Sequence, residues 1–163
     1  MIRFLAAILL AAVAHCAAAD TLTGRVVSIA DGDTITVLDT ANTQYKIRLS
    51  GVDAPEKGQP YGRVSRQRLA DSVFTKTVQV EWDKRDRYGR IVGKVIADGR
   101  DVCLSQIEAG LAWHYKKYEM EQPVADRRAY ADAEVRARDQ KRGLWMDAHP
   151  VPPWEWRRAA RSN

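Results

Sequence analysis

The sequence has 163 residues, of which 45% are hydrophobic and 29% charged, with 10 glycines and 6 prolines. This balance is typical of a folded domain and excludes a collagen-like or intrinsically disordered chain. A chain of this length buries enough apolar surface to fold as one domain. Two cysteines exclude a disulfide-dense scaffold and a zinc site built from thiolates alone. The formal charge of +5 makes a polyanion a candidate partner, although a role in solubility explains the charge equally well.

The N-terminal segment, residues 1–19, has the pattern of a cleavable export signal. Arg3 precedes an unbroken apolar run over residues 4–14, and small residues stand before Asp20. The run is shorter than the roughly 20 residues that a membrane-spanning helix needs. We therefore expect cleavage before Asp20, a periplasmic or secreted protein, and no stable membrane insertion afterwards; an uncleaved anchor is the alternative. Cys103 would then be the only cysteine, and its apolar neighbours predict a buried structural thiol.

Hydrophobic periodicity predicts strands first and helices later in the chain. Alternating apolar residues predict five strands, at 25–29, 34–38, 45–49, 78–83 and 91–97. Apolar residues at helical spacing predict three helices, at 61–76, 102–111 and 122–142. Five short strands with a helix after the third are typical of a Greek-key barrel of the oligonucleotide-binding (OB) kind. We predict a β-rich α+β fold, an OB-fold-like five-stranded Greek-key barrel with about three flanking helices.

Carboxylates lie at the ends of two predicted strands. Asp33 shares a face with the apolar residues of the strand that it begins, so its carboxylate is expected at the barrel mouth, where a metal ion or a basic partner would offset its desolvation. Asp53 and Glu56 follow the strand that contains Arg48. Strict alternation places Arg48 and Asp53 on opposite faces, so both reach one site only if the chain bends, and we predict that bend at Gly51. Taken alone, each cluster is more typical of a solvated turn or loop.

Two further segments combine basic and aromatic residues. The predicted turn at 83–90 contains several arginines, whose planar guanidinium groups suit phosphate. Residues 113–118 alternate tryptophan and tyrosine with histidine and lysine, a pattern suited to single-stranded nucleic acid. A buried Trp113 beside solubilising lysines is an equally weighted alternative.

Three motifs in order resemble the thermonuclease, or staphylococcal nuclease-like, family. They are Asp31-Gly32-Asp33-Thr34, Arg48-Leu49 with Asp53-Ala54-Pro55-Glu56, and Asp86-Arg87-Tyr88-Gly89-Arg90. The resemblance runs from about Gly24 to Trp145, so we expect a nuclease-like domain over 20–146. The remaining tail, 147–163, contains prolines that exclude a regular helix throughout, and its tryptophans and arginines could either cover the barrel or touch substrate.

The resemblance implies a metal site and a general base. In the family, the positions of Asp33 and Asp53 bind calcium together with a backbone carbonyl at the position of Ala54. These oxygen donors alone leave magnesium or another divalent cation open. The position of Glu56 is assigned to the general base that activates water for attack on phosphorus.

The resemblance also implies how phosphate and bases are bound. Arg48 and Arg90 match two catalytic arginines that neutralise the charge developing on phosphate in the transition state. Arg87 and Tyr88 match residues that touch a terminal phosphate, and Tyr115 is expected to stack on a base.

The implied function is that of an exported, Ca²⁺-dependent nuclease. It would hydrolyse phosphodiester bonds of DNA and RNA with little base specificity, favour single strands, leave 3′-phosphate ends and act as a monomer. The alternative is a non-catalytic OB-fold module that binds single-stranded nucleic acid. A binding-only relative could lose the implied metal ligands, base and arginines, all of which are present here.

Overall fold

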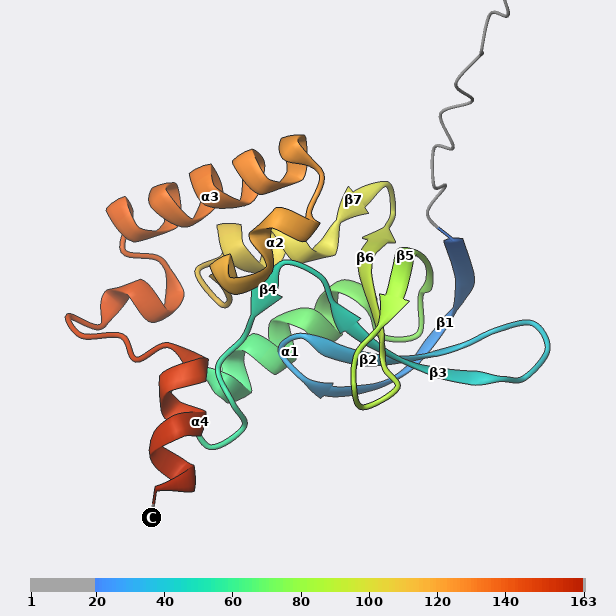
Figure 1. Cartoon of the computed structure of the whole chain (residues 1–163), viewed down its shortest axis with the longest axis horizontal. Helices are drawn as coiled ribbons and strands as arrows, with labels where there is room; N and C mark the ends of the chain where they lie inside the picture. The colour runs from blue at the N-terminus through green and yellow to red at the C-terminus, as the bar shows by residue number, and fades with distance from the viewer. Residues whose placement is uncertain (1–19, 163) are drawn as a thin grey trace, which may run out of the picture.

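A computed structural model describes residues 20–162 of the chain (Figure 1). The expected export signal, residues 1–19, lies outside the described residues, as does residue 163. No helix within residues 20–162 is long and apolar enough to cross a membrane.

Five strands form a closed barrel. They follow one another in the order β3-β2-β1-β5-β6, and β3 pairs with β6 in parallel to close it. Their bounds are β1 (Asp20–Asp31), β2 (Thr34–Leu38), β3 (Gln44–Leu49), β5 (Thr77–Arg85) and β6 (Ile91–Ala97). Three strands of two residues each complete the set, namely β4 (Val52–Asp53), β7 (Arg100–Asp101) and β8 (Trp113–His114). The OB-fold-like α+β prediction is confirmed.

Period-two burial explains why these segments are strands. In β6, buried and half-buried residues alternate along the whole strand, and in β5 Val78 and Val80 are buried while Gln79 and Glu81 are exposed. β1 is longer than the predicted 25–29 because its first half pairs with β5 and its second half with β2. β1 therefore pairs with two different strands along its length. The alternation of apolar residues within one segment does not predict this extension.

Helices cover the barrel on one side and continue beyond it (Figure 1). Their bounds are α1 (Gly62–Val73), α2 (Val102–Glu108), α3 (Val124–Asp139) and α4 (Pro153–Arg161), with short 3₁₀ segments η1 (Lys116–Glu121) and η2 (Gly143–Met146). α1 buries Leu69 and Val73 in the core. Asp101 caps α2 by accepting a hydrogen bond from the Leu104 amide at 3.0 Å, and it accepts another from the Tyr130 hydroxyl at 2.8 Å. One carboxylate thus fixes the position of α3 against α2.

The tail contributes the fourth helix and covers one end of the domain. α4 begins at Pro153, where the missing amide proton of proline costs nothing. Trp154 packs against a cluster around the buried Trp113 and Trp145. The Gln59 side-chain amide donates to the Val151 carbonyl at 2.6 Å, so the tail is tied to the loop that joins β4 to α1. Figure 1 shows α4 beside this loop.

Candidate active site

One open cleft at the barrel mouth is lined by every residue that the sequence marked for function. Segments of the β3–β4 turn, the β5–β6 turn, η1, α3 and α4 contribute to its walls. The nine marked residues along it are Asp33, Arg48, Asp53, Ala54, Glu56, Arg87, Tyr88, Arg90 and Tyr115.

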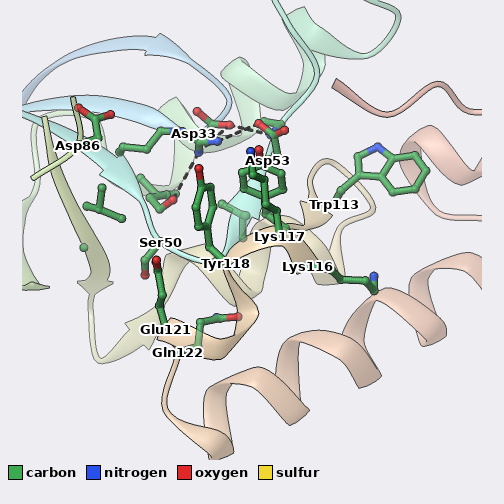
Figure 2. A pocket seen from close by; sticks show the side chains of 18 of the residues that line it. Asp33, Ser50, Asp53, Asp86, Trp113, Lys116, Lys117, Tyr118, Glu121 and Gln122 are labelled. Carbon is green, nitrogen blue, oxygen red and sulfur yellow. Dashed lines mark hydrogen bonds and ion pairs between the residues drawn. The ribbon is translucent and has the colours of Figure 1, made fainter. Parts of the chain in front are cut away.

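Asp33, Arg48 and Asp53 form one ion-pair network at the base of this cleft. The Arg48 Nη1 atom lies 2.8 Å from Asp33 Oδ2, and Arg48 Nη2 lies 2.8 Å from Asp53 Oδ1. Figure 2 shows the two aspartates with dashed lines marking interactions around them. The Ala54 amide also donates to Asp33 Oδ2 at 2.7 Å. Four residues from three separate segments therefore meet through the two carboxylates.

Burial shifts the pKa values of residues in this network. Asp33 is 5% exposed and Asp53 only 1%. Burial raises the pKa of Asp33 to about 7, although Arg48 and the Ala54 amide oppose the shift. Burial would lower the pKa of Arg48, but Asp33 and Asp53 outweigh it and the pKa is raised. Burial thus disfavours the charged form of Asp33, and positively charged neighbours such as Arg48 favour it.

The predicted bend lies at Gly51. Ser50 and Gly51 form a turn between β3 and β4, and Gly51 adopts a φ of +70°, in the left-handed region that favours glycine. A Cβ atom at this position would lie 2.1 Å from Gln122 Nε2. The turn reverses the alternation of the strand and brings Asp53 to the side of Arg48, so this prediction is confirmed.

Glu56 lies beside the network rather than inside it. Its side chain is 36% exposed, and its backbone amide donates to Gln59 Oε1 at 3.1 Å. Gly62 approaches the Glu56 carbonyl so closely that a Cβ atom would lie 1.9 Å from it. The loop that presents Glu56 is therefore held on both sides, while its carboxylate stays accessible to water.

The β5–β6 turn carries a second arginine group. Arg90 donates from Nε to Asp86 Oδ2 at 2.7 Å, and its Nη2 atom lies 2.7 Å from the same oxygen. Burial would raise the pKa of Asp86, but hydrogen bonds from the Arg90 side chain and from the Arg90 and Tyr88 amides outweigh it and lower the pKa. Arg87 donates to the Tyr88 hydroxyl at 2.7 Å at the exposed tip of the turn. Asp86 therefore orients Arg90 in the cleft, whereas Arg87 and Tyr88 face solvent.

The aromatic and basic segment 113–118 divides between core and surface. Trp113 is 7% exposed and packs edge-on against Trp145, so the alternative of a buried Trp113 is correct. Lys116 forms an ion pair with Glu134, and His114 is buried with its Nε2 atom 2.8 Å from Gln122 Oε1. The side chains of Trp113, His114 and Lys116 therefore contact other parts of the domain.

Tyr115 faces the cleft and is held by its backbone. Its amide donates to the Gly51 carbonyl at 2.9 Å, which joins it to the β3–β4 turn. Its ring stacks on Trp154 of α4, with ring centroids 5.7 Å apart and an angle of 20° between the planes. The ring expected to stack on a base is therefore in contact with the tail.

Arg157 is a site residue that sequence reasoning did not single out. Its Nη2 atom lies 2.7 Å from Asp53 Oδ2, and its Nη1 atom lies 2.6 Å from Glu56 Oε1. Burial would lower the pKa of Arg157, but the hydrogen bonds to Asp53 and Glu56 outweigh it and raise the pKa. The only signal in the sequence was the group of tryptophans and arginines in the tail, which says nothing about the distance to Asp53.

The oxygen donors fit a hard divalent cation. Carboxylates are ligands that calcium and magnesium prefer, together with backbone carbonyls and water. No group of three or more His, Cys, Asp or Glu side chains suited to a metal ion occurs among residues 20–162. A site here would thus depend on Asp33 and Asp53 with backbone or water oxygens, and not on a dense cluster of side chains.

Comparison with known proteins identifies the family. Residues 46–147 match the model of the staphylococcal nuclease homologue family. An uncharacterized endonuclease of Escherichia coli is 50% identical over 135 residues, covering 82% of this chain and 84% of its own. A micrococcal nuclease of Shigella flexneri is 43% identical over 148 residues, covering 85% and 82%. Protein ParB of Escherichia coli is 38% identical over 172 residues, covering 100% and 94%. The chain belongs to the staphylococcal nuclease homologue family, as its motifs predicted.

Proposed function

We propose that this protein is an exported, calcium-dependent nuclease that hydrolyses phosphodiester bonds of DNA and RNA. The single observation that carries the proposal is the buried Asp33–Arg48–Asp53 network with the accessible Glu56 beside it. Family membership and the endonuclease and micrococcal nuclease names of the relatives support it. The signal-like pattern of residues 1–19 supports export to the periplasm or the medium.

The two aspartates would hold the cation, with the Ala54 backbone carbonyl as a third donor. A bound divalent cation supplies Lewis-acid polarisation of phosphate and lowers the pKa of water. The protein contributes a buried, negatively charged position for it. Because Arg48 bridges both aspartates, it fixes their relative position before any ligand arrives.

Glu56 would accept the proton of the attacking water. Its carboxylate is accessible to solvent and its loop is fixed by Gln59, as a general base requires. Arg48 and Arg90 would donate to the phosphate oxygens as negative charge develops in the transition state. The contacts of Arg90 with Asp86 limit the positions of its guanidinium group in the cleft, which supports this role.

The cleft beyond these residues suits a nucleic acid strand. Arg87 and Tyr88 at the exposed tip of the β5–β6 turn would touch a terminal phosphate, and Tyr115 would stack on a base. Stacking accepts any base, so we propose low base specificity and a preference for single strands, whose bases are free to stack. Nothing in this site requires a second copy, and we propose a monomer that leaves 3′-phosphate ends.

The test is cleavage of labelled single-stranded DNA and RNA by the protein beginning at Asp20, in calcium, in magnesium and in a chelator. We expect cutting in calcium, 3′-phosphate ends on the products, and loss of cutting in the chelator and in Glu56→Gln. Tight binding without cutting in any metal would instead support the non-catalytic binding module and overturn the proposed nuclease.

A further inference from the structure

The C-terminal helix α4 enters the cleft at two places that the proposed function assigns to ligands. Arg157 contacts the carboxylates of Asp53 and Glu56, and Trp154 stacks on Tyr115. We propose that α4 is a displaceable internal competitor, in which Arg157 competes with the divalent cation and Trp154 covers the ring face expected to bind a base. This inference rests on the proposed function.

Arg157 binds both oxygens of the Asp53 carboxylate. Asp53 Oδ2 accepts from Arg157 Nη2 at 2.7 Å, and Oδ1 accepts from Arg157 Nη1 at 3.2 Å. The same Oδ1 accepts from Arg48 Nη2 at 2.8 Å. Both oxygens of an almost fully buried carboxylate are therefore bound by guanidinium groups, so a cation must share or take over these lone pairs.

Arg157 and a divalent cation weaken each other's binding to the carboxylates because both are positively charged. Arg157 brings one positive charge to Asp53 and Glu56, and a divalent cation would bring two to the same carboxylates. Asp53 is 1% exposed, so little water screens the repulsion between the two positive groups. Binding of the cation therefore weakens the hold on Arg157, and the bound Arg157 weakens the affinity for the cation by the same factor.

The rest of α4 is held lightly. Pro153 is the only buried residue of this helix, and the Arg157 side chain is 37% exposed. A helix of 9 residues is marginal without tertiary contacts. Its release therefore costs mainly the Arg157 ion pairs and the packing of Pro153 and Trp154. A cation and a stacked base would replace the ion pairs and the contact of Trp154 with Tyr115.

The test measures calcium affinity directly by isothermal titration of the protein beginning at Asp20. We expect Arg157→Ala to bind calcium about 5-fold or more tighter than wild type, a coupling typical of linked sites. Arg157→Lys keeps the positive charge but loses the bidentate guanidinium contact. Its calcium affinity should therefore lie between those of wild type and Arg157→Ala. Arg128→Ala is the matched control, because it removes the same charge from an exposed position of α3 that does not line the cleft, and it should bind calcium like wild type.

Hydrogen exchange provides a readout that does not involve catalysis. Calcium should speed exchange of the α4 amides in wild type, and Trp154→Ala should show faster exchange there even without calcium. Thermal unfolding of each variant checks that the barrel is intact.

Equal calcium affinity of wild type and Arg157→Ala, or weaker binding by Arg157→Ala, would overturn the inference. If the proteins nevertheless bind calcium and cut DNA, the proposed function stands while α4 is not a competitor. Absence of both calcium binding and cutting in all proteins overturns the two proposals together.

Discussion

The guanidinium of Arg48 binds the carboxylate of Asp53, 2.8 Å from Nη2 to Oδ1, although the turn at Gly51 separates the two residues in the chain. The same guanidinium binds Asp33 with its other terminal nitrogen. Under the proposed function Arg48 has two roles, because it pairs with two buried carboxylates in the free protein and would donate to phosphate oxygens in the transition state. A change at this residue is expected to affect both stability and turnover.

Replacing Arg48 by alanine should destabilise the fold as well as remove activity. Loss of one partner of a buried pair costs about 3–5 kcal/mol, since the remaining charges stay desolvated. We expect the free energy of unfolding in urea to fall by that order, and cleavage to fall by about 100-fold or more. Arg48→Lys should recover much of the stability and little of the activity, because lysine lacks the planar fork that bridges Asp33 and Asp53. Full activity in Arg48→Lys would contradict the role in phosphate binding.

Glu56→Gln separates catalysis from stability. The side chain is 36% exposed and its ion pair with Arg157 is partly solvated, so the free energy of unfolding should change by less than about 1 kcal/mol. Removal of a general base should lower kcat by about 100-fold or more. Glu108→Gln, an exposed glutamate at the end of α2, is the control and should leave both quantities unchanged. A large loss of stability in Glu56→Gln would point to a structural role.

The strands of the barrel could be predicted from sequence, because the alternation of buried and exposed side chains appears within each short segment. The segments predicted at 34–38 and 91–97 coincide with β2 and β6, and the predicted helix at 122–142 contains α3. The end of this helix was overestimated, since α3 ends at Asp139, residues 140–141 form a turn, and Gly143, with a φ of +53°, begins the 3₁₀ segment η2. Alanine stands at every fourth position of this helix from Ala125 to Ala137, and of these Ala133 and Ala137 are buried whereas Ala125 is exposed.

The sequence predicted those site residues that belong to short contiguous motifs, and it did not predict the site residue that comes from a distant segment. Asp33, Arg48 and Asp53 lie within a few residues of strand ends, where turn geometry limits their positions. Arg157 reaches Asp53 across 104 positions of sequence, and no local pattern encodes that distance. The two-residue pairing of β4 with β8, which places Asp53 opposite Trp113, is likewise set by tertiary packing.

Cys103 should be unreactive in the folded protein. Its thiol is buried in the core, and burial raises its pKa to about 12 because the thiolate would be desolvated. The thiol therefore stays almost wholly protonated at pH 8 and at pH 9, so its alkylation should be slow at both, whereas an exposed cysteine with a pKa near 8.5 is already about one quarter thiolate at pH 8. We expect slow alkylation by iodoacetamide in buffer and fast alkylation in concentrated urea. Rapid native alkylation that follows an ordinary thiol pKa near 8.5 would contradict the buried position.

Gly51 should be more sensitive to alanine than another glycine of the same conformation. Gly51 and Gly89 have φ angles of +70° and +78°, so alanine costs about 1 kcal/mol of backbone strain at either position. Only at Gly51 would the added Cβ also collide, at 2.1 Å, with Gln122 Nε2, whereas nothing lies within 4 Å at Gly89. We expect Gly51→Ala to lose about 1–3 kcal/mol more unfolding free energy than Gly89→Ala, measured in urea. Because the turn also places Asp53 beside Arg48, calcium affinity should fall in Gly51→Ala and stay unchanged in Gly89→Ala. Equal losses in the two variants would show that the Gln122 side chain moves aside and that the close approach at Gly51 is not needed to form the site.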